Sequence, residues 1–397
     1  MAEHGNGTPI FHRTVLATRL ATQVLSNSLG AASTSGLFLA APRRTGKSTF
    51  MREDLRPALE SKGACVLYVD LWANKASDPG DMIVSAVRSA LAQNAGVVTR
   101  LARNAGMEKV SVGGLSFSLD KVGLGSASIS LSEALAALSD DIRKPIVLII
   151  DEAQHAITSS KGYEALFALK ASRDELNSSK HFGLRIVATG SNRDKLAMLR
   201  NSKDQAFFGA PLVPFPELDA AFVEWFCNGI DLPAPLNPTQ VQALFKQASC
   251  RPEMLGAAAE ELRFDFTLQP EDVGARFEAA VLAQIAASDM QTLRVVNSLT
   301  PLQSAVLRVM AVKQSHFAPY QEDTLNAYAA VLEAIAPHET LKPDGSNVQQ
   351  ALLALQDKSL VWKETRGVYA IEEPSTVDLM QVNGMLDMVP NAALRAE

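Results

Sequence analysis

The apolar positions in the first half of the chain follow two alternating patterns. Four short continuous apolar runs, typical of buried strands, lie at residues 37–41, 65–71, 146–150 and 184–189. Before and between these runs, apolar residues recur at a spacing close to 3.6, which predicts helices at residues 16–29, 50–59, 81–106 and 163–175. Strands that alternate with helices indicate parallel βαβ units. The pattern therefore predicts an α/β fold, with a parallel sheet and helices on both of its faces.

One segment interrupts this alternation. Small polar and apolar residues alternate over about residues 108–132, with Gly123 and Gly125 in the middle. This pattern predicts an antiparallel hairpin that is inserted before the third strand. Two interpretations remain: a surface hairpin with one face packed against the core, or an element that binds a partner or lines a pore.

The second half of the chain has a different pattern. Strand signals stop after the proline-rich residues 211–216. Short helices are expected at 220–228, 238–249 and 252–263, followed by a longer one at 270–288. From Thr300 onward, helices at 301–313, 323–335 and 347–358 precede two short strands at 360–363 and 368–371, which predicts a winged helix. The domains expected are therefore an α/β core (1–215), a helical bundle (216–290) and a winged-helix domain (291–397).

Composition excludes several classes of protein. The 37 basic and 43 acidic residues give a net charge of −6, so the chain as a whole is no polycation that coats nucleic acid or anionic lipid. Its apolar runs are far too short to span a membrane. Three widely separated cysteines, Cys65, Cys227 and Cys250, form no disulfide framework or zinc-ligand spacing. Since no secretory signal is visible, we expect a cytoplasmic protein without a membrane partner.

The first candidate site follows the first predicted strand. Residues 41–48 read APRRTGKS, which fits the broader form of the phosphate-binding loop between a strand and a helix. In such a loop the backbone N–H groups and the helix N-terminus face phosphates, the lysine reaches the β- and γ-phosphates, and the final hydroxyl binds Mg²⁺. The alternative is an ordinary strand-to-helix turn with solvated cations. The residues expected to bind nucleotide are Ala41, Pro42, Arg43, Arg44, Thr45, Gly46, Lys47, Ser48 and Thr49.

The second candidate site lies at the end of the third predicted strand, where Asp151 and Glu152 are adjacent. A carboxylate at this point can hold Mg²⁺ through its hydration shell, and the next can orient the water that attacks a γ-phosphate. The alternative is a helix N-terminus rich in acidic residues. Because both halves of a nucleotide site occur in the required order, the sequence predicts an ATP site with Ser48 and Asp151 as metal ligands and Glu152 as the catalytic carboxylate.

Together these motifs resemble those of P-loop ATPases of the AAA+ and STAND kind. The sequence is similar to a bacterial and archaeal family whose loop reads GPRRxGKT and whose acidic strand ends in DExQ; here the stretches are APRRTGKS and DEAQ at residues 151–154. Ala41 departs from the usual first glycine. The resemblance implies an α/β P-loop core, a helical lid, a C-terminal winged helix, and ATP and Mg²⁺ as cofactors.

The resemblance extends, more loosely, into three later segments. Residues 186–192 (IVATGSN) look like the family's strand-end sensor, which implies that Asn192 or Ser191 contacts the γ-phosphate or the attacking water. Residues 249–255 (SCRPEML) are similar to the lid segment, where Arg251 matches a second sensor. Residues 367–380 resemble the terminal winged-helix signature. Asn192 could equally cap the strand, and Arg251 could equally be the polar entry to a helix.

Two further assignments follow from related ATPases, and a third follows from the sequence alone. A neighbouring subunit there supplies an arginine finger, for which Arg200, or else Arg193, is the candidate here; the alternative is a solvated helix charge. The segment Ile10, Phe11, His12 and Arg13 either packs against adenine or forms the entry to the first helix. His155 is interpreted as a local hydrogen-bond partner of the acidic pair.

The charge of the winged-helix region bears on the partner. From Thr300 to Glu397 there are 7 basic and 12 acidic residues, a net charge of −5, and the helix at 347–358 has a largely apolar face. Duplex DNA requires clustered cations, so a packing or protein-contact role is favoured there. Lys363 and Arg366 could touch a DNA backbone, and the cations Arg100, Arg103 and Lys109 form either a small patch or a solvated face.

These observations predict an ATP-hydrolysing switch that changes conformation or assembly, with self-association and a protein effector as in STAND proteins. The alternative is a DNA-associated ATPase of the initiator or transposition-regulator type, with a DNA channel formed by the assembled cores. A third reading is a nucleotide-binding scaffold without turnover. The three readings differ in DNA-stimulated activity and in the effect of Glu152→Gln.

Overall fold

The structure is a computed structural model in which the chain divides into two compact units, Met1–Phe222 and Val223–Glu397. The described residues are 9–26, 35–41, 44–74, 76–94, 116–118, 128–178, 181–191, 193–200, 206–338, 340, 342–363 and 369–390.

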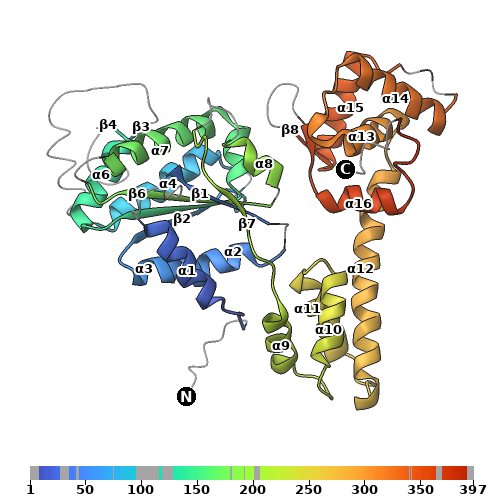
Figure 1. Ribbon diagram of the computed structural model, residues 1–397, viewed down its shortest axis with the longest axis horizontal. Helices are drawn as coiled ribbons and strands as arrows, with labels where there is room; N and C mark the ends of the chain where they lie inside the picture. The colour runs from blue at the N-terminus through green and yellow to red at the C-terminus, as the bar shows by residue number, and fades with distance from the viewer. Residues whose placement is uncertain are drawn as a thin grey trace. The chain divides into compact units, whose positions relative to one another are not determined.

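The first unit is built on a parallel sheet of five strands, with the spatial order β2-β5-β6-β1-β7 (Figure 1). Every residue of β5 and β6 is buried, as expected of continuous apolar runs in the middle of a parallel sheet. Because all strands are parallel, their carboxyl ends meet at one edge. The strands are β1 (Leu37–Ala40), β2 (Cys65–Asp70), β5 (Ile146–Asp151), β6 (Leu184–Gly190) and β7 (Leu212–Pro214).

The strand β7 was not predicted and lies within the proline-rich residues 211–216, after which the strand signals were expected to stop. It pairs with β1 at the edge of the sheet, and the amide of Phe38 donates to the Pro211 carbonyl over 2.9 Å. Proline cannot donate a ladder hydrogen bond and is therefore tolerated at sheet edges and strand ends. Prolines 211, 214 and 216 obscure this short strand in the sequence, but all of them fit an edge position.

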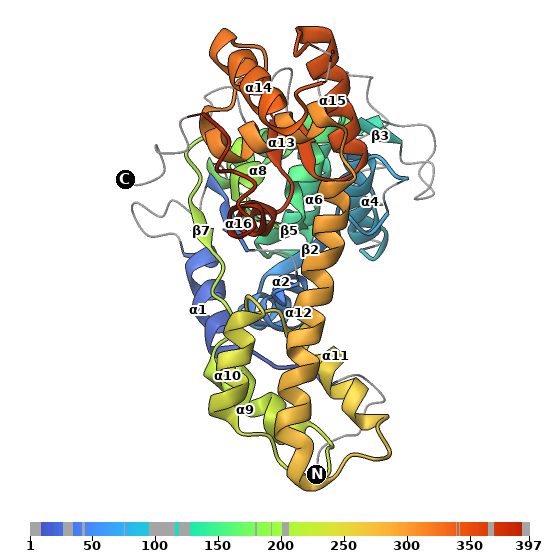
Figure 2. The same cartoon turned by 90° about the vertical axis from the view of Figure 1, so that its right-hand side faces the viewer.

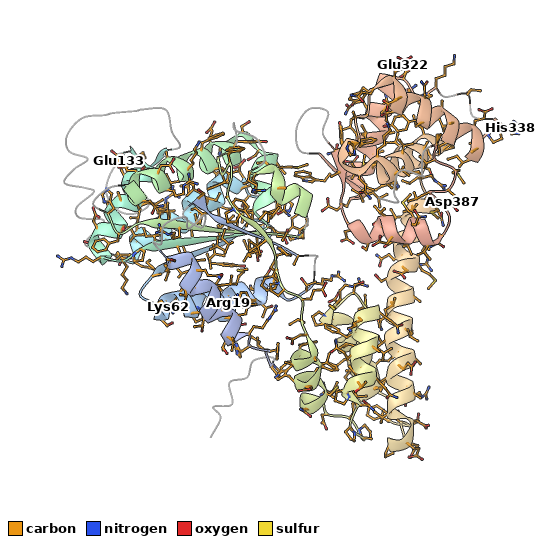
Figure 3. All side chains as sticks on the ribbon, viewed as in Figure 1. Arg19, Lys62, Glu133, Glu322, His338 and Asp387 are labelled. Atoms are coloured by element: carbon orange, nitrogen blue, oxygen red, sulfur yellow. The ribbon has the colours of Figure 1, made fainter. Side chains whose placement is uncertain are left out.

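One face of the sheet is covered by the first helices (Figure 1). These are α1 (Thr14–Leu25), α2 (Lys47–Phe50) and α3 (Arg56–Ser61), with a π-helical turn at Met51–Leu55 between the last two. The predicted helix at 50–59 therefore starts three residues earlier, directly after the loop. The charged residues Arg19 of α1 and Lys62, which directly follows α3, are exposed; Figure 3 labels both. The buried stripe of α1 consists of Ala17, Ala21 and Val24, with the flanking leucines partly buried.

The opposite face is covered by α4 (Pro79–Ala92), α6 (Leu131–Ile142) and α7 (Ser160–Ser178). The predicted hairpin is present as the antiparallel strands β3 (Ser116–Ser118) and β4 (Ser128–Ser130). It ends before residue 132, because Ser130 caps α6 in a reciprocal capping box with Glu133, which Figure 3 labels. That helix was not predicted. The helix predicted at 81–106 ends at Ala92, with Gln93 as its C-cap, and residues 95–106 lie outside the described residues.

The second unit begins with a helical bundle and continues into three helices and a hairpin, in the order predicted for a winged helix. Figure 2 shows α10 and α11 alongside α12. The helix α12 has 25 residues and extends nine residues beyond the predicted end at 288. The bundle helices are α9 (Ala220–Gly229), α10 (Pro238–Gln247), α11 (Pro252–Arg263) and α12 (Val273–Asn297).

The remaining elements of the second unit share one apolar core, in which Tyr328, Val306 and Leu352 are fully buried. The helix α16 was not predicted. None of the helices in the described ranges is both long and apolar enough to cross a bilayer. These elements are α13 (Pro301–Lys313), α14 (Glu322–Ile335), α15 (Gly345–Asp357), β8 (Val361–Lys363), β9 (Tyr369–Ile371) and α16 (Pro374–Val382).

The backbone of Gly162, in α7, packs closely against the backbone of Ala156, in the segment that follows β5. A Cβ atom at Gly162 would lie 1.9 Å from the carbonyl oxygen of Ala156, so Gly162→Ala should lower the free energy of unfolding by about 1–3 kcal/mol. Urea unfolding measures the loss. As a control, Gly256 lies exposed in α11 with nothing within 4 Å of the same position, and Gly256→Ala should instead be neutral or stabilising. Equal effects of the two substitutions would contradict the close contact.

Candidate functional site

The loop after β1 has the backbone geometry of a tight strand-to-helix turn. The amide of Ala41 donates to the carbonyl of Gly190 over 3.1 Å, which fixes the start of the loop against β6. Arg44 and Gly46 have positive φ angles of 62° and 79°, and α2 begins at the next residue, Lys47. Glycine adopts this left-handed conformation without strain. Pro42 and Arg43 lie outside the described residues.

Lys47 is almost fully buried, with 4% of its surface exposed. Its Nζ donates to Oε1 of Glu152 over 3.2 Å, across 105 positions of sequence. A buried ammonium is costly unless it is paired, and this contact with Glu152 provides the pairing. Thr45 is buried beside it, while Ser48 and Thr49 are partly exposed in the first turn of α2. The structure thus brings the two predicted halves of the site into contact.

Asp151 ends β5 with no exposed surface and accepts hydrogen bonds from three groups. The hydroxyl of Tyr68 donates to Oδ2 over 2.9 Å, the amide of Glu152 donates to Oδ1 over 3.1 Å, and the hydroxyl of Thr189 also donates to Oδ1. Burial, followed by the charge of Asp151, raises the pKa of Tyr68, which keeps it a donor. These contacts hold the carboxylate in a fixed orientation.

Glu152 has a left-handed backbone conformation, with φ 53° and ψ 44°. Such strain in a residue other than glycine is typical of functional sites. Its Oε2 accepts from the hydroxyl of Ser191 over 2.8 Å, from the Ser191 amide over 3.3 Å and from Nε2 of Gln154. Burial opposes ionisation, but the charge of Lys47 and these hydrogen bonds together lower the pKa of Glu152. The carboxylate of Glu152 is therefore ionised, and its hydrogen bonds fix its orientation.

The edge of the site next to β2 is acidic and aromatic. Asp70 aligns with Asp151 in the sheet register, and burial raises the pKa of Asp70. The rings of His155 and Trp72 are in contact at a tilt of 38°, with 4.4 Å between their centroids. His155 was interpreted as a hydrogen-bond partner of the acidic pair; the ring contact with Trp72 is a feature that the sequence did not indicate.

Several residues predicted for the site either have other contacts in the structure or lie outside the described residues. Asn192 and the side chain of Arg193 are not among the described atoms. Nε of Arg200 donates to the Ala210 carbonyl, just before β7, and Nε of Arg251 donates to the Ala248 carbonyl over 3.1 Å, in the second unit. The sensor and finger roles of these residues stay predictions. The wing residue Arg366 and the patch residues Arg100, Arg103 and Lys109 also lie outside the described residues.

The segment before α1 is attached to the core by specific contacts. Nδ1 of His12 lies 2.8 Å from Asp54 in the π-helical turn, and the guanidinium of Arg13 donates to the carbonyls of Pro216 and Glu217 over 2.9 and 3.1 Å. The rings of Phe11 and Phe222 meet edge to face at 5.6 Å. These contacts favour the interpretation of the segment as the entry to α1; a contact with adenine stays a prediction.

Tyr68, Thr189 and Gln154 are the site residues that the sequence analysis did not assign. The first two are polar residues within apolar strands, and the strand order shows why they meet: β2 and β6 flank β5 on either side. A polar residue near the end of a buried strand is the signal that could have found them. Gln154 belongs to the DEAQ stretch, but the orientation of its side chain depends on the turn at Glu152.

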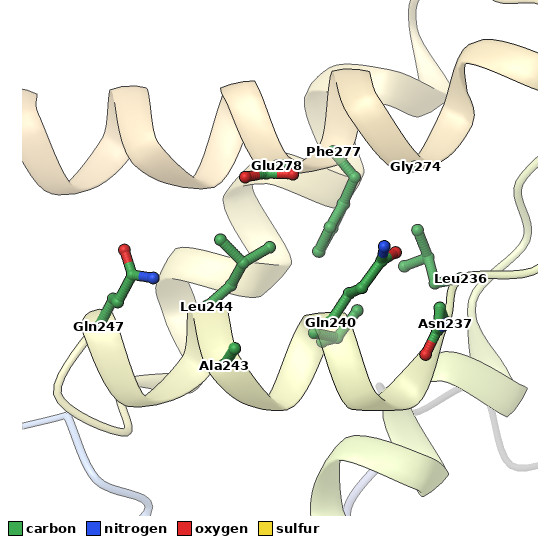
Figure 4. A pocket seen from close by; sticks show the side chains of 10 residues that line it. Leu236, Asn237, Gln240, Ala243, Leu244, Gln247, Gly274, Phe277 and Glu278 are labelled. Atoms are coloured by element: carbon green, nitrogen blue, oxygen red, sulfur yellow. The ribbon is translucent and has the colours of Figure 1, made fainter.

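A separate hollow of about 260 Å³ lies in the second unit between α10 and α12 (Figure 4). Leu244 and Phe277 line it, with Gln240 and Glu278 also present. It contains none of the residues that the sequence predicted for a functional site.

The site combines a buried cation, two carboxylates and a serine hydroxyl at the carboxyl edge of a parallel sheet. This edge is where α/β proteins bind ligands, and the start of α2 offers backbone N–H groups to an anion. The arrangement can bind a phosphate chain and polarise a water molecule beside it.

Comparison with solved structures finds chains of similar fold. The Walker-type ATPase of Pyrococcus abyssi aligns with 92% of this chain and 95% of its own length, at 15% identity and a TM-score of 0.51. The ORC2 protein of Aeropyrum pernix in its ADP form aligns with 100% and 98%, at 16% identity and a TM-score of 0.51. The chain has the P-loop NTPase fold. No protein-family model matches the sequence, and no curated protein does.

Proposed function

We propose that this P-loop protein binds ATP with Mg²⁺ and hydrolyses it, acting as a nucleotide-driven switch of conformation or assembly. The observation that carries the proposal is the contact between Lys47 and Glu152 at 3.2 Å, which joins the phosphate loop to the acidic strand end. The likeness of the fold to ATPases supports it.

In the proposed reaction, each part of the site has one task. The backbone amides after Ala41 and the ammonium of Lys47 bind the triphosphate. Oε1 of Glu152 accepts a proton from a water molecule, whose oxygen forms a bond to the γ-phosphorus. The bond between that phosphorus and the bridging oxygen breaks at the same time, and ADP and inorganic phosphate leave. Ser191 orients Glu152 through its hydroxyl and amide.

The donor set fits a magnesium ion. Mg²⁺ prefers oxygen ligands and is held in nucleotide enzymes by one or two protein groups together with phosphates and water. Ser48 and Asp151 are such groups, and within the described parts of the chain no cluster of three or more metal-binding side chains competes with them. When bound, the ion neutralises charge on the β- and γ-phosphate oxygens.

The contact of Tyr68 with Asp151 gives a test of this metal site. Tyr68→Phe removes the hydroxyl that donates to Oδ2, so we expect the magnesium concentration needed for half-maximal ATP turnover to rise about tenfold or more. Turnover measured against free Mg²⁺ gives this value. Tyr320→Phe, which removes a hydroxyl bonded to Gln349 in the second unit, should leave it unchanged. An identical magnesium dependence of both variants would contradict the assigned role of Asp151.

The switch follows from a competition for Lys47. In the structure the ammonium is paired with Glu152, whereas a bound triphosphate attracts the same cation. The partners of Glu152 therefore differ between the free and the ATP-bound protein, and a ligand shifts an equilibrium only through such differences in contacts. Hydrolysis removes the γ-phosphate and with it one of the competing anions.

Measurement of particle mass tests both the proposed assembly switch and the kind of partner, protein or DNA. Glu152→Gln should bind ATP without consuming it, so its particle mass with ATP should exceed that of one 42.6 kDa chain, and it should return to the smaller mass with ADP. Equal masses with ATP, with ADP and without nucleotide would contradict an assembly switch.

The acidic C-terminal region favours a protein effector over DNA. Added duplex DNA decides this point: a further mass increase that declines with salt supports the DNA-associated alternative.

A further inference from the structure

Gln154 is a fully buried polar residue two positions after Glu152. The left-handed conformation of Glu152 reverses the chain at the end of β5, and the 3₁₀ helix Ala153–Thr158 follows directly. This turn directs the side chain of Gln154 back to the carboxylate. Its Nε2 donates to Oε2 of Glu152 over 2.5 Å and lies 3.5 Å from the hydroxyl of Ser191.

The orientation of the amide follows from its surroundings. If the amide were reversed, its oxygen would face the ionised carboxylate of Glu152, so the nitrogen must lie on that side. Oε1 then lies against Gly190, where a Cβ atom would come within 2.7 Å of it. Among the residues that the structure describes, Oε1 has no hydrogen-bond partner. A buried carbonyl without a donor costs free energy, which indicates that packing alone does not explain this glutamine.

The two oxygens of Glu152 have different partners. Lys47 donates to Oε1, whereas Ser191 and Gln154 both donate to Oε2. When the phosphates of a nucleotide attract Lys47, Oε1 loses its partner and Oε2 keeps both of its own. The carboxylate then remains in place with one oxygen free to accept a proton from water.

We propose that Gln154 is a positioning residue, which holds Oε2 of Glu152 so that Oε1 faces the attacking water. This inference rests on the proposed ATPase function and adds to it a residue that acts through Glu152. Gly190 is part of the same arrangement, because only a residue without a side chain leaves room for the side-chain amide of Gln154.

The test uses Gln154→Met, which keeps the length of the side chain and removes both the donor and the unpartnered acceptor. We expect turnover of bound ATP to decrease about ten- to hundredfold, the worth of one hydrogen bond to a charged group, with ATP affinity within twofold of wild type. The melting temperature should be unchanged or higher. A merely structural glutamine would instead lower the melting temperature and the affinity together. Gln93→Met, at an exposed position after α4, is the matched control.

Two further variants separate the possible failures. Gly190→Ala displaces the amide without altering it, and should reduce turnover in the same way. In the Glu152→Gln background, Gln154→Met should cause no additional loss. Unchanged turnover in Gln154→Met, while Glu152→Gln is inactive, overturns this inference alone. Unchanged turnover in Glu152→Gln would overturn the proposed function instead.

Discussion

Glu152→Gln is expected to reduce ATP turnover by about 10²–10⁴-fold and to leave nucleotide binding intact. The amide keeps the size of the side chain and can still bond to Ser191, but it has no carboxylate to accept the proton of the attacking water. Steady-state phosphate release gives the turnover, and the equilibrium binding of ATP gives the affinity.

The matched control for this prediction is Glu60→Gln. Glu60 is an exposed acidic residue of the same unit, paired with Arg56 over 2.9 Å. Its neutralisation should change neither turnover nor affinity, because exposed ion pairs contribute little. Turnover in Glu152→Gln equal to that of this control would contradict the catalytic role of Glu152. Binding of ATP without turnover in wild type would favour the reading of the chain as a nucleotide-binding scaffold.

Lys47→Ala is expected to abolish the stabilisation of the protein by ATP. The substitution removes the cation proposed to bind the β- and γ-phosphates, and truncating one partner of such a buried charge pair costs about 2–5 kcal/mol of binding free energy. Wild type should melt at a higher temperature as the ATP concentration rises, since a ligand that binds only the folded state stabilises it. The variant should show no such shift.

Lys47→Ala also leaves the carboxylate of Glu152 buried without its cation, so the variant should be less stable than wild type before nucleotide is added. Lys62→Ala, at an exposed lysine after α3, controls for the loss of positive charge. An ATP-dependent shift of equal size in Lys47→Ala and Lys62→Ala would show that the phosphates are bound elsewhere.

Much of the fold could be predicted from apolar patterning. The runs that form β5 and β6 are continuous because both faces of these strands are buried, and such runs are recognisable without other information. The strand β7 escaped prediction because prolines mask a short edge strand. The helix α6 escaped because its cap, Ser130, is also the last residue of β4. The end of α12 was set too early because four of the five residues 288–292 are polar and interrupt its apolar spacing.

The site could be predicted only in its motif residues. Lys47, Asp151 and Glu152 follow from short segments whose chemistry is local. The partners of Asp151, in contrast, come from β2 and β6, and nothing in the sequence states that these strands flank β5. The orientation of Gln154 depends on one left-handed residue and on a glycine in another strand. Contacts of this kind require the strand order and the register, which short sequence patterns do not contain.

Calorimetric titration of the protein with magnesium ATP tests the proposed nucleotide site most directly. We expect an isotherm with one nucleotide bound per wild-type chain, and loss of this binding in Lys47→Ala but not in Lys62→Ala. An absence of heat in the wild type, or the same isotherm in wild type and Lys47→Ala, would contradict a nucleotide site formed by the loop after β1 and the end of β5.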